Sequence, residues 1–376
     1  MAGAAMALLR ASAAPVLLLH SSLLVLMVWA AAPAGGVDVV WNSKGWPGGG
    51  PAPNAPNACP QSQNPVALLA SFGVVRANAG AAYYGPGPGD CINTMGAFGM
   101  WPALPGYLGS KHAVNGGIPQ RGNLTLHLAA VAASVKRYMP SSAFAGDAVL
   151  DFEAWIPDYD SNTIGRLSAY QAASQQWVRE RHPSWNESRI AATARAEFNS
   201  AARQFLEGTL RLCQAMRPKA SWGYWGWPNC GSSCHWDASW QAGCPASSVE
   251  RNDRMNWLYA ASDALYAGIY LCDGADTRGQ FVPAVLSEVT RVAARHPRLP
   301  IRPYVYAQWE STGSWLKRSV LDQYLGRIVN ASTRVDRMVL WGGYLNSKNH
   351  SANATNCALF EEYFTGTLGP ALAALR

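Results

Sequence analysis

The chain has 376 residues, of which 49% are hydrophobic and 14% are charged, and its formal net charge is +7. This size and apolar content suit one large α/β domain or two ordinary ones with a sizeable buried core. The basic residues form no run and have acidic neighbours, so nucleic acid is not an expected partner. A positive charge does favour the attraction of an anionic polymer.

The first 34 residues are typical of a secretory signal peptide. Arg10 precedes a mostly apolar run at 13–32, and small residues close it at 30–34. A positive start, an apolar centre and a small-residue end define such a signal. An uncleaved membrane anchor is the alternative, because the run is nearly long enough to span a bilayer. We expect cleavage, secretion to the extracellular space or a lysosome-like compartment, no stable membrane insertion afterwards, and a single mature domain at 35–376.

Cysteines and glycosylation triplets agree with export. The eight cysteines are an even number, as disulfide-bonded secreted proteins usually have. Five Asn-X-Ser/Thr triplets would lie at the surface if they are glycosylated. The acceptor residues are Asn123, Asn186, Asn330, Asn349 and Asn353.

Beyond a loop at 48–60 that is rich in glycine, proline and asparagine, short strand-like runs alternate with longer helical patterns. Strands are expected at 37–41, 72–76, 148–155, 221–227, 267–272, 301–309 and 337–343. Helices are expected at 124–139, 165–181, 188–216, 251–265, 282–296, 314–329 and 358–374. Strands that alternate with helices favour a parallel sheet or a closed (β/α) barrel.

Two acids, Asp151 and Glu153, follow the apolar run at 148–150. In a strand, alternate residues face the same side with Cα atoms roughly 7 Å apart, so both carboxyl groups should project from the C-terminal end of a barrel strand. Two crowded carboxyls beside apolar neighbours do not easily both ionise, and one should keep a proton that it can donate to a glycosidic oxygen. Acids that cap a helix or bind an arginine are the alternative.

Aromatic residues and glycines gather at two other expected strand ends. The segments are S-W-G-Y-W-G-W at 221–227 and W-G-G-Y at 341–344. Sugars present flat apolar faces, and aromatic walls suit them. Core filling is the alternative use of these tryptophans. Together with the carboxyl pair, the clusters indicate a glycosidase.

Six segments carry a resemblance to a known family. They are D-A-V-L-D-F-E-A-W-I-P at 147–157, W-G-Y-W-G-W-P-N-C at 222–230, N-D-x-x-x-W-L at 252–258, A-L-Y-A-G-I-Y at 264–270, V-L-W-G at 339–342 and E-Y-F-T-G-T-L-G-P at 362–370. In order and spacing they resemble the hyaluronidases, glycoside hydrolase family 56. The resemblance implies a distorted (β/α) TIM-like barrel and endo-hydrolysis of hyaluronan or chondroitin, an anionic glycosaminoglycan, with no metal and no cofactor.

The resemblance also implies a retaining mechanism in which the acetamido oxygen of the substrate attacks the anomeric carbon. Glu153 would be the general acid/base, and Asp151 would hold the acetamido N–H and stabilise its developing charge. Tyr270 would form a hydrogen bond near the acetamide, and Trp341 would pack on the acetyl group.

The disulfide expectations also come from the resemblance. It implies two disulfides, Cys59 with Cys357 and Cys230 with Cys244. The other four cysteines could form two more, although Cys213 lies beside an apolar helix stripe and could be a buried thiol. They are Cys91, Cys213, Cys234 and Cys272. A zinc site made of Cys230, Cys234, His235 and Cys244 is an alternative that an oxidising compartment disfavours.

Three positions depart from the family pattern. Trp225 stands where a tyrosine helps to position the acetamide, and Tyr224 could replace that hydroxyl only if the strand register shifted. Ile156 replaces a common arginine, and Asn229 stands where an acid is common. These departures leave two alternatives to the favoured enzyme: a catalytically weak glycan-binding or adhesion protein on the same fold, and a hydrolase for a chitin-like chain.

Overall fold

The computed structural model describes residues 37–42, 68–69, 71–72, 99–106, 110–235, 243–274, 279–332, 334–341 and 354–375. All of them belong to one compact unit, residues 32–376. The predicted signal peptide, the loop at 48–60 and most of the expected strand at 72–76 lie outside the described residues. Within the described ranges, no helix combines the length and the apolar character needed to cross a membrane.

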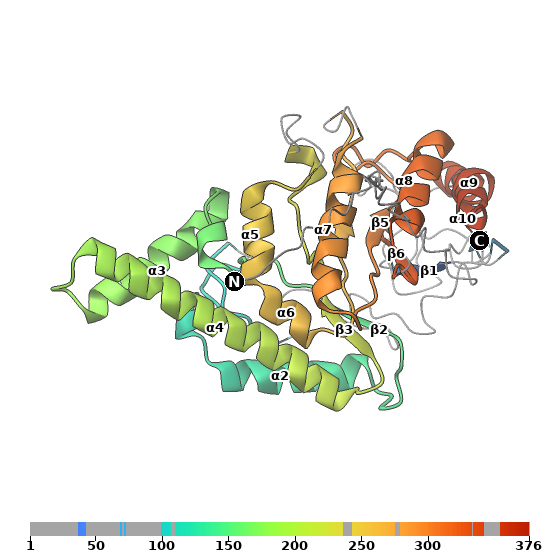
Figure 1. The fold of residues 1–376 in the computed structure, drawn as a ribbon. Coiled ribbons are helices and arrows are strands. Elements are labelled where there is room, and N and C mark those ends of the chain that lie inside the picture. Colours follow the sequence, from blue (N-terminus) through green and yellow to red (C-terminus); the bar gives the residue numbers. More distant parts are fainter. Residues whose placement is uncertain are drawn as a thin grey trace, which may run out of the picture. The chain divides into compact units, whose positions relative to one another are not determined.

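Parallel strands lie at the centre of the fold (Figure 1). They are β1 Asp38–Asn42, β2 Asp147–Leu150, β3 Ser221–Tyr224, β4 Gly268–Ile269, β5 Tyr304–Tyr306 and β6 Arg337–Trp341. One sheet has the order β1-β6-β5-β4, and β2 pairs with β3. A bridge between Trp225 and Tyr266 connects β3 to the segment that leads into β4. The spatial order is therefore β2-β3-β4-β5-β6-β1, in which each strand follows its neighbour in sequence as in a (β/α) barrel.

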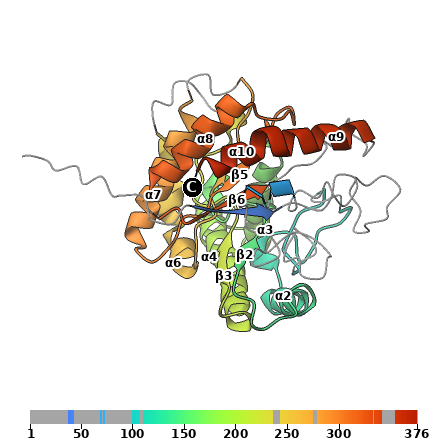
Figure 2. The same cartoon turned by 90° about the vertical axis from the view of Figure 1, so that its right-hand side faces the viewer.

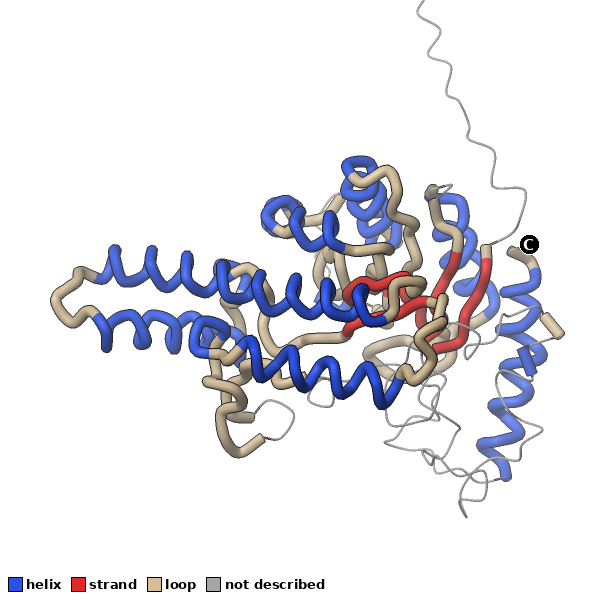
Figure 3. Tube along the Cα trace, turned by 90° about the horizontal axis from the view of Figure 1, so that it is seen from below, coloured by secondary structure: helices blue, strands red, loops and turns tan. Residues whose placement is uncertain are grey.

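Helices surround these strands (Figures 1 and 2). They are α2 Leu124–Tyr138, α3 Ser168–Arg181, α4 Glu187–Met216, α5 Ala246–Arg254, α6 Asn256–Ala261, α7 Phe281–Arg295, α8 Arg318–Ala331, α9 Ala354–Tyr363 and α10 Gly369–Ala373. α2 and α3 both pack along α4, and α7 packs against α8. Figure 3 shows the strands, in red, beside one end of the long helix α4.

The longest helix, α4, has a sequence that explains its position. The Asn186 side chain caps its first turn by accepting a hydrogen bond from Arg189 N at 2.9 Å. A buried stripe recurs at near-helical spacing and faces the rest of the core. The stripe consists of Ile190, Ala194, Phe198, Ala202 and Phe205. Because Trp155 packs edge-on against Phe198 with ring centroids 5.6 Å apart, this stripe also anchors the segment that follows β2.

Several expected elements are shorter in the structure than predicted, or are divided or irregular. The strand expected at 148–155 ends at Leu150, because the chain then leaves the sheet to pack Phe152 and Trp155 into the core. The helix expected at 251–265 is two helices, α5 and α6, which meet at Met255 and end before the chain enters the sheet at Leu265. The helix expected at 358–374 contains the π-helical turn Phe364–Leu368.

A buried ion cluster lies at the N-terminal end of the strands. Asp147, the first residue of β2, is 1% exposed. Its carboxylate accepts hydrogen bonds from Arg302 Nη1 at 2.5 Å and from Arg337 Nη1 at 2.6 Å. The Tyr266 hydroxyl, from inside the barrel, lies 2.9 Å from the same carboxylate. The cluster therefore joins β2 to the chain before β5 and to β6, far from the strand ends that carry the carboxyl pair.

Asp147→Ala is expected to destabilise the fold, because it leaves two partly buried guanidinium groups without their shared carboxylate. Breaking a buried ion pair in this way costs about 3–5 kcal/mol of unfolding free energy. Asp336→Ala is the matched control, since Asp336 also pairs with Arg302 but its side chain is 47% exposed, and it should cost less than about 1 kcal/mol. Urea denaturation measures both, and equal losses would contradict the structural role of Asp147.

Candidate active site

The segment after β2 is held by aromatic packing on one side. Phe152 stacks on Trp101 with ring centroids 4.2 Å apart, and Trp155 Nε1 donates to the Pro102 carbonyl at 2.7 Å. Asp151 is buried, whereas Glu153 is exposed. The two acids therefore lie beyond the C-terminal end of β2 as predicted, but on a loop anchored by its aromatic residues and not on a continuing strand.

The following loop is also fixed by hydrogen bonds. The buried Asn162 side chain accepts from Ile156 N at 2.9 Å and donates to the Ile156 carbonyl at 2.8 Å. Asp158 accepts two hydrogen bonds of 2.8 Å from Arg254 of α5. These contacts tie the loop that carries Glu153 to the helices around it.

Aromatic side chains cap the interior of the barrel at the same end. Trp225, Tyr270 and Trp341 pack on a small buried cluster inside the strands. That cluster consists of Val149, Ala264, Tyr266, Tyr304 and Val339. The structure therefore brings together three of the four aromatic residues expected in the substrate site.

Tyr224 does not join this group. Its side chain is buried, and its hydroxyl donates to the Leu206 carbonyl of α4 at 3.0 Å. Neighbouring strand residues face opposite ways, so Trp225 faces the barrel interior while Tyr224 faces the helices. No shift in register brings the Tyr224 hydroxyl to the site.

A pocket of about 690 Å³ opens beside these aromatic residues at the C-terminal ends of the strands. Trp225 and Tyr270 form part of its wall, with ring centroids 6.0 Å apart. Ile156 and Glu310 also line it. Its size is in the range of small-molecule and sugar sites.

Burial and nearby carboxyl groups together raise the pKa of Glu153. Burial of its carboxyl among protein atoms, although part of the residue is exposed, raises the pKa of Glu153 to about 7, and the nearby negative charges of Asp151 and Glu310 act in the same direction. Arg166 opposes this rise. Glu153 can therefore hold a proton close to neutral pH, as a general acid requires.

The rate of any reaction that uses Glu153 as an acid should fall as pH rises through about 7. Above that pKa, the protonated fraction falls roughly tenfold for each pH unit. Removing a negative charge with Glu310→Gln should move this alkaline limb to lower pH, because Glu310 helps to raise the pKa of Glu153. A kcat–pH profile of both proteins tests this, and a limb that stays in place would contradict the assigned influence of Glu310.

Glu310 and Arg166 were not among the predicted site residues. Glu310 follows β5 after a run of aromatic residues, the same strand-then-acid pattern that revealed the carboxyl pair, so a signal existed. Arg166 lies in a short 3-10 turn, Gly165–Leu167, and no sequence pattern connects it with the acids. Its influence depends on how the loop after β2 folds back.

The cysteines form one expected and one additional disulfide. Cys230 pairs with Cys244 as implied by the resemblance, and Cys234 pairs with Cys272. These bonds take three of the sulfurs of the alternative zinc site. Cys213 is a buried free thiol, as the apolar stripe suggested. Cys357 is disulfide-bonded, while Cys59 and Cys91 lie outside the described residues, so the pairing with Cys59 stays a prediction.

The fold and site define a (β/α) barrel with a carboxyl pair and an aromatic-walled pocket at the C-terminal strand ends, where barrel enzymes carry their active sites. A family model described as hyaluronidase matches residues 59–376. The chain is 36% identical to Hyaluronidase-3 of Sus scrofa over 84% of this chain and 74% of that protein. It is 32% identical to Hyaluronidase-1 of Bos taurus over 76% of this chain and 62% of that protein. The chain belongs to the hyaluronidase family.

Solved structures agree with this assignment. The crystal structure of bee venom hyaluronidase in complex with a hyaluronic acid tetramer matches with a TM-score of 0.73 and 27% identity, covering 90% of this chain and 99% of that one. A monoclinic crystal structure of the bee venom enzyme matches with a TM-score of 0.68. The likeness confirms the expected barrel fold. The chain spans about 62% and 57% of the length of Hyaluronidase-1 from Bos taurus and Mus musculus.

Proposed function

We propose that the protein is a secreted, retaining endo-β-N-acetylhexosaminidase that hydrolyses hyaluronan, chondroitin or both. The observation that carries the proposal is the carboxyl pair Asp151 and Glu153 beyond β2, in a chain of the hyaluronidase family. The two acids do not themselves line the aromatic-walled pocket, but Glu310, whose charge acts on Glu153, does. The raised pKa of Glu153 supports its use as the acid. The relatives of this chain include proteins named Hyaluronidase-1 and Hyaluronidase-3.

In the proposed reaction, Glu153 donates its proton to the glycosidic oxygen as the bond to the anomeric carbon breaks. The acetamido oxygen of the same sugar attacks that carbon from the opposite face and forms a cyclic, positively charged intermediate. The carboxylate of Asp151 accepts a hydrogen bond from the acetamido N–H and stabilises this positive charge. The Glu153 carboxylate then takes a proton from water, which attacks the same carbon and restores the original configuration.

The aromatic residues fit the remaining requirements. Trp225 and Tyr270 offer apolar faces for the C–H surfaces of a sugar, and Trp341 lies against the same buried cluster. Trp225 packs over Gly268, where an added Cβ would lie 3.5 Å from the indole ring. We propose that Trp225 contributes an apolar wall in place of the tyrosine hydroxyl of other family members.

Export is part of the proposal. Two disulfides join described cysteines, and such bonds persist in oxidising compartments. Among the acceptor asparagines, Asn123, Asn186 and Asn330 are exposed, as an attached glycan requires. Asn349 and Asn353 lie outside the described residues.

A substrate panel tests the function. The wild-type protein is incubated with hyaluronan, chondroitin and a chitin-like chain, and polymer size is followed on a gel alongside Glu153→Gln. Shortening of hyaluronan or chondroitin by the wild type alone is the expected result. Binding without cleavage would favour the weak glycan-binding alternative, and cleavage of the chitin-like chain alone would favour a different hydrolase.

A further inference from the structure

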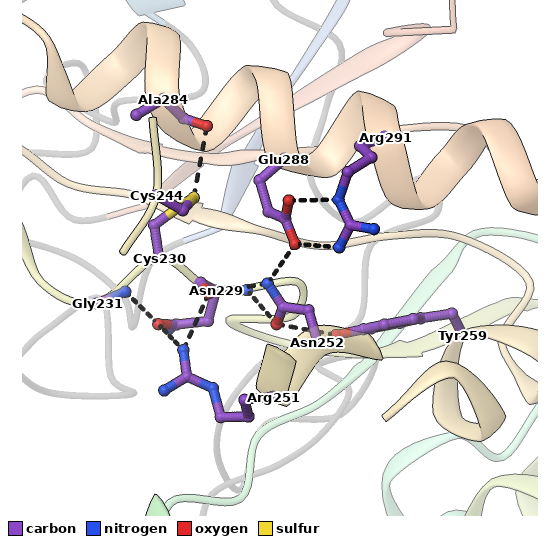
Figure 4. The surroundings of a disulfide bond; sticks show 10 residues. All are labelled: Asn229, Cys230, Gly231, Cys244, Arg251, Asn252, Tyr259, Ala284, Glu288 and Arg291. Carbon is purple, nitrogen blue, oxygen red and sulfur yellow. Dashed lines mark hydrogen bonds and ion pairs between the residues drawn. A yellow bond between two sulfur atoms is a disulfide. The ribbon is translucent and has the colours of Figure 1, made fainter. Parts of the chain in front are cut away.

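Arg251 of α5 brings a positive charge to the pocket wall. Its Nη2 atom donates to the carbonyl oxygen of Asn229 at 2.9 Å and lies 3.3 Å from Asn229 Oδ1 (Figure 4). The guanidinium lies over the Trp227 ring, 5.6 Å from its centroid. Across the described part of the chain, Arg251 has no carboxylate within ion-pair distance, so neutral oxygens take the place of a counter-charge.

Arg254, the other described arginine that lines this pocket, is paired with a carboxylate. Arg254 shares two hydrogen bonds of 2.8 Å with the buried carboxylate of Asp158, so its charge is already neutralised. Burial lowers the pKa of Arg251, as expected for a guanidinium held without a full counter-charge. Arg251 is thus the described pocket arginine whose charge remains available to an anion.

Residue 229 explains why this charge is available. An aspartate there would place a carboxylate against the guanidinium, whereas the amide of Asn229 accepts a hydrogen bond without adding charge. The Asn229 backbone is held by Asn252, whose Nδ2 donates to its carbonyl at 3.1 Å, and Asn252 in turn donates to the buried Glu288 at 2.8 Å (Figure 4). The neighbouring Cys230–Cys244 disulfide holds the same loop. The site is therefore built and not a chance approach of two surface groups.

We propose that Arg251 binds the carboxylate of a uronate residue of the polymer, and that Asn229 keeps this guanidinium from being neutralised internally. The inference rests on the proposed function, since it names the sugar that occupies this part of the pocket. A planar guanidinium suits a carboxylate, which it can bind through two parallel hydrogen bonds. Ile156, which stands where a family arginine is common, lines the same pocket as Arg251.

Two variants test the proposal with hyaluronan and with carboxyl-reduced hyaluronan, which lacks the uronate charge. Asn229→Asp is nearly isosteric and should form an ion pair with Arg251, while Arg251→Gln removes the charge. Each should raise KM for hyaluronan roughly tenfold or more, the effect of losing a charged hydrogen bond, and change KM for the reduced polymer less than about twofold. kcat should change little, because neither residue contacts the reacting atoms.

Arg318→Gln is the charge-matched control, since Arg318 pairs with Asp322 on α8 and does not line the pocket; its KM for hyaluronan should stay near that of the wild type. Equal KM changes on both polymers, or no KM change with Asn229→Asp, would overturn the proposal.

Binding of a hyaluronan oligosaccharide to the same variants in a Glu153→Gln background separates the proposed role of Arg251 from the proposed hydrolase function. If the wild type cleaves nothing, the proposed function fails, while a loss of affinity in these variants would still support Arg251.

Discussion

Glu153→Gln is expected to lower kcat on hyaluronan by about 10²–10⁴-fold, because an amide cannot deliver the proton that the leaving oxygen requires. KM should change little, since the amide keeps the size and most of the contacts of the carboxyl group. Reducing-end release under steady-state conditions measures the loss. Glu362→Gln makes the same chemical change on an exposed residue of α9 and should keep wild-type activity.

The same variant should not lose stability. The pKa of Glu153 is raised from 4.5 to about 7 in the folded protein, so ionisation of this group costs the folded state stability as pH rises through that window. A neutral glutamine removes this cost, and the thermal unfolding midpoint at neutral pH should equal or exceed that of the wild type. A folded Glu153→Gln variant that keeps more than about a tenth of the wild-type rate would contradict the role of Glu153 as the acid.

Asp151→Asn is expected to lower kcat by about 10²–10³-fold, the usual effect of removing a group that stabilises charge in the transition state. The amide cannot balance the positive charge that develops on the acetamido group. The same substitution should also shift the pH profile, and this shift can be measured separately from the loss of kcat. The charge of Asp151 helps to raise the pKa of Glu153. The alkaline limb of the residual activity of Asp151→Asn should therefore lie at lower pH than that of the wild type.

A kcat–pH profile of Asp151→Asn therefore distinguishes an electrostatic role from a structural one. Damage to the loop after β2 would lower the rate at every pH without a directed shift of the limb. An alkaline limb that stays at the wild-type pH would argue against the coupling between the two carboxyl groups. Retention of full activity would remove Asp151 from the reaction.

Long amphipathic helices were predictable from the sequence, and the strand ends were not. α2, α4 and α7 begin and end within a residue of their expected bounds, because their apolar stripes repeat over several turns. β4 has two residues where six were expected, since a strand ends where its neighbours stop pairing and not where its own pattern stops. Local sequence carries little information on that partner-dependent limit.

The chemistry of the site was more predictable than its geometry. Asp151 and Glu153 stood out as an acid pair after an apolar run, yet their position on a loop depends on contacts between Phe152, Trp101 and other distant aromatic residues. Glu310 and Arg166 reach the carboxyl pair from other elements, so their effect on the pKa of Glu153 arises only in the folded chain. The availability of the Arg251 charge likewise depends on its long-range contact with Asn229.

The stereochemistry of the first product tests the proposed mechanism most directly. Proton NMR in D2O, recorded during early hyaluronan cleavage, identifies the anomer released before mutarotation. Attack by the acetamido group followed by water gives two inversions, so the β-anomer should appear first. Initial release of the α-anomer would mean that water displaces the leaving group in one step, and the proposed roles of Asp151 and of the acetamido oxygen would be wrong.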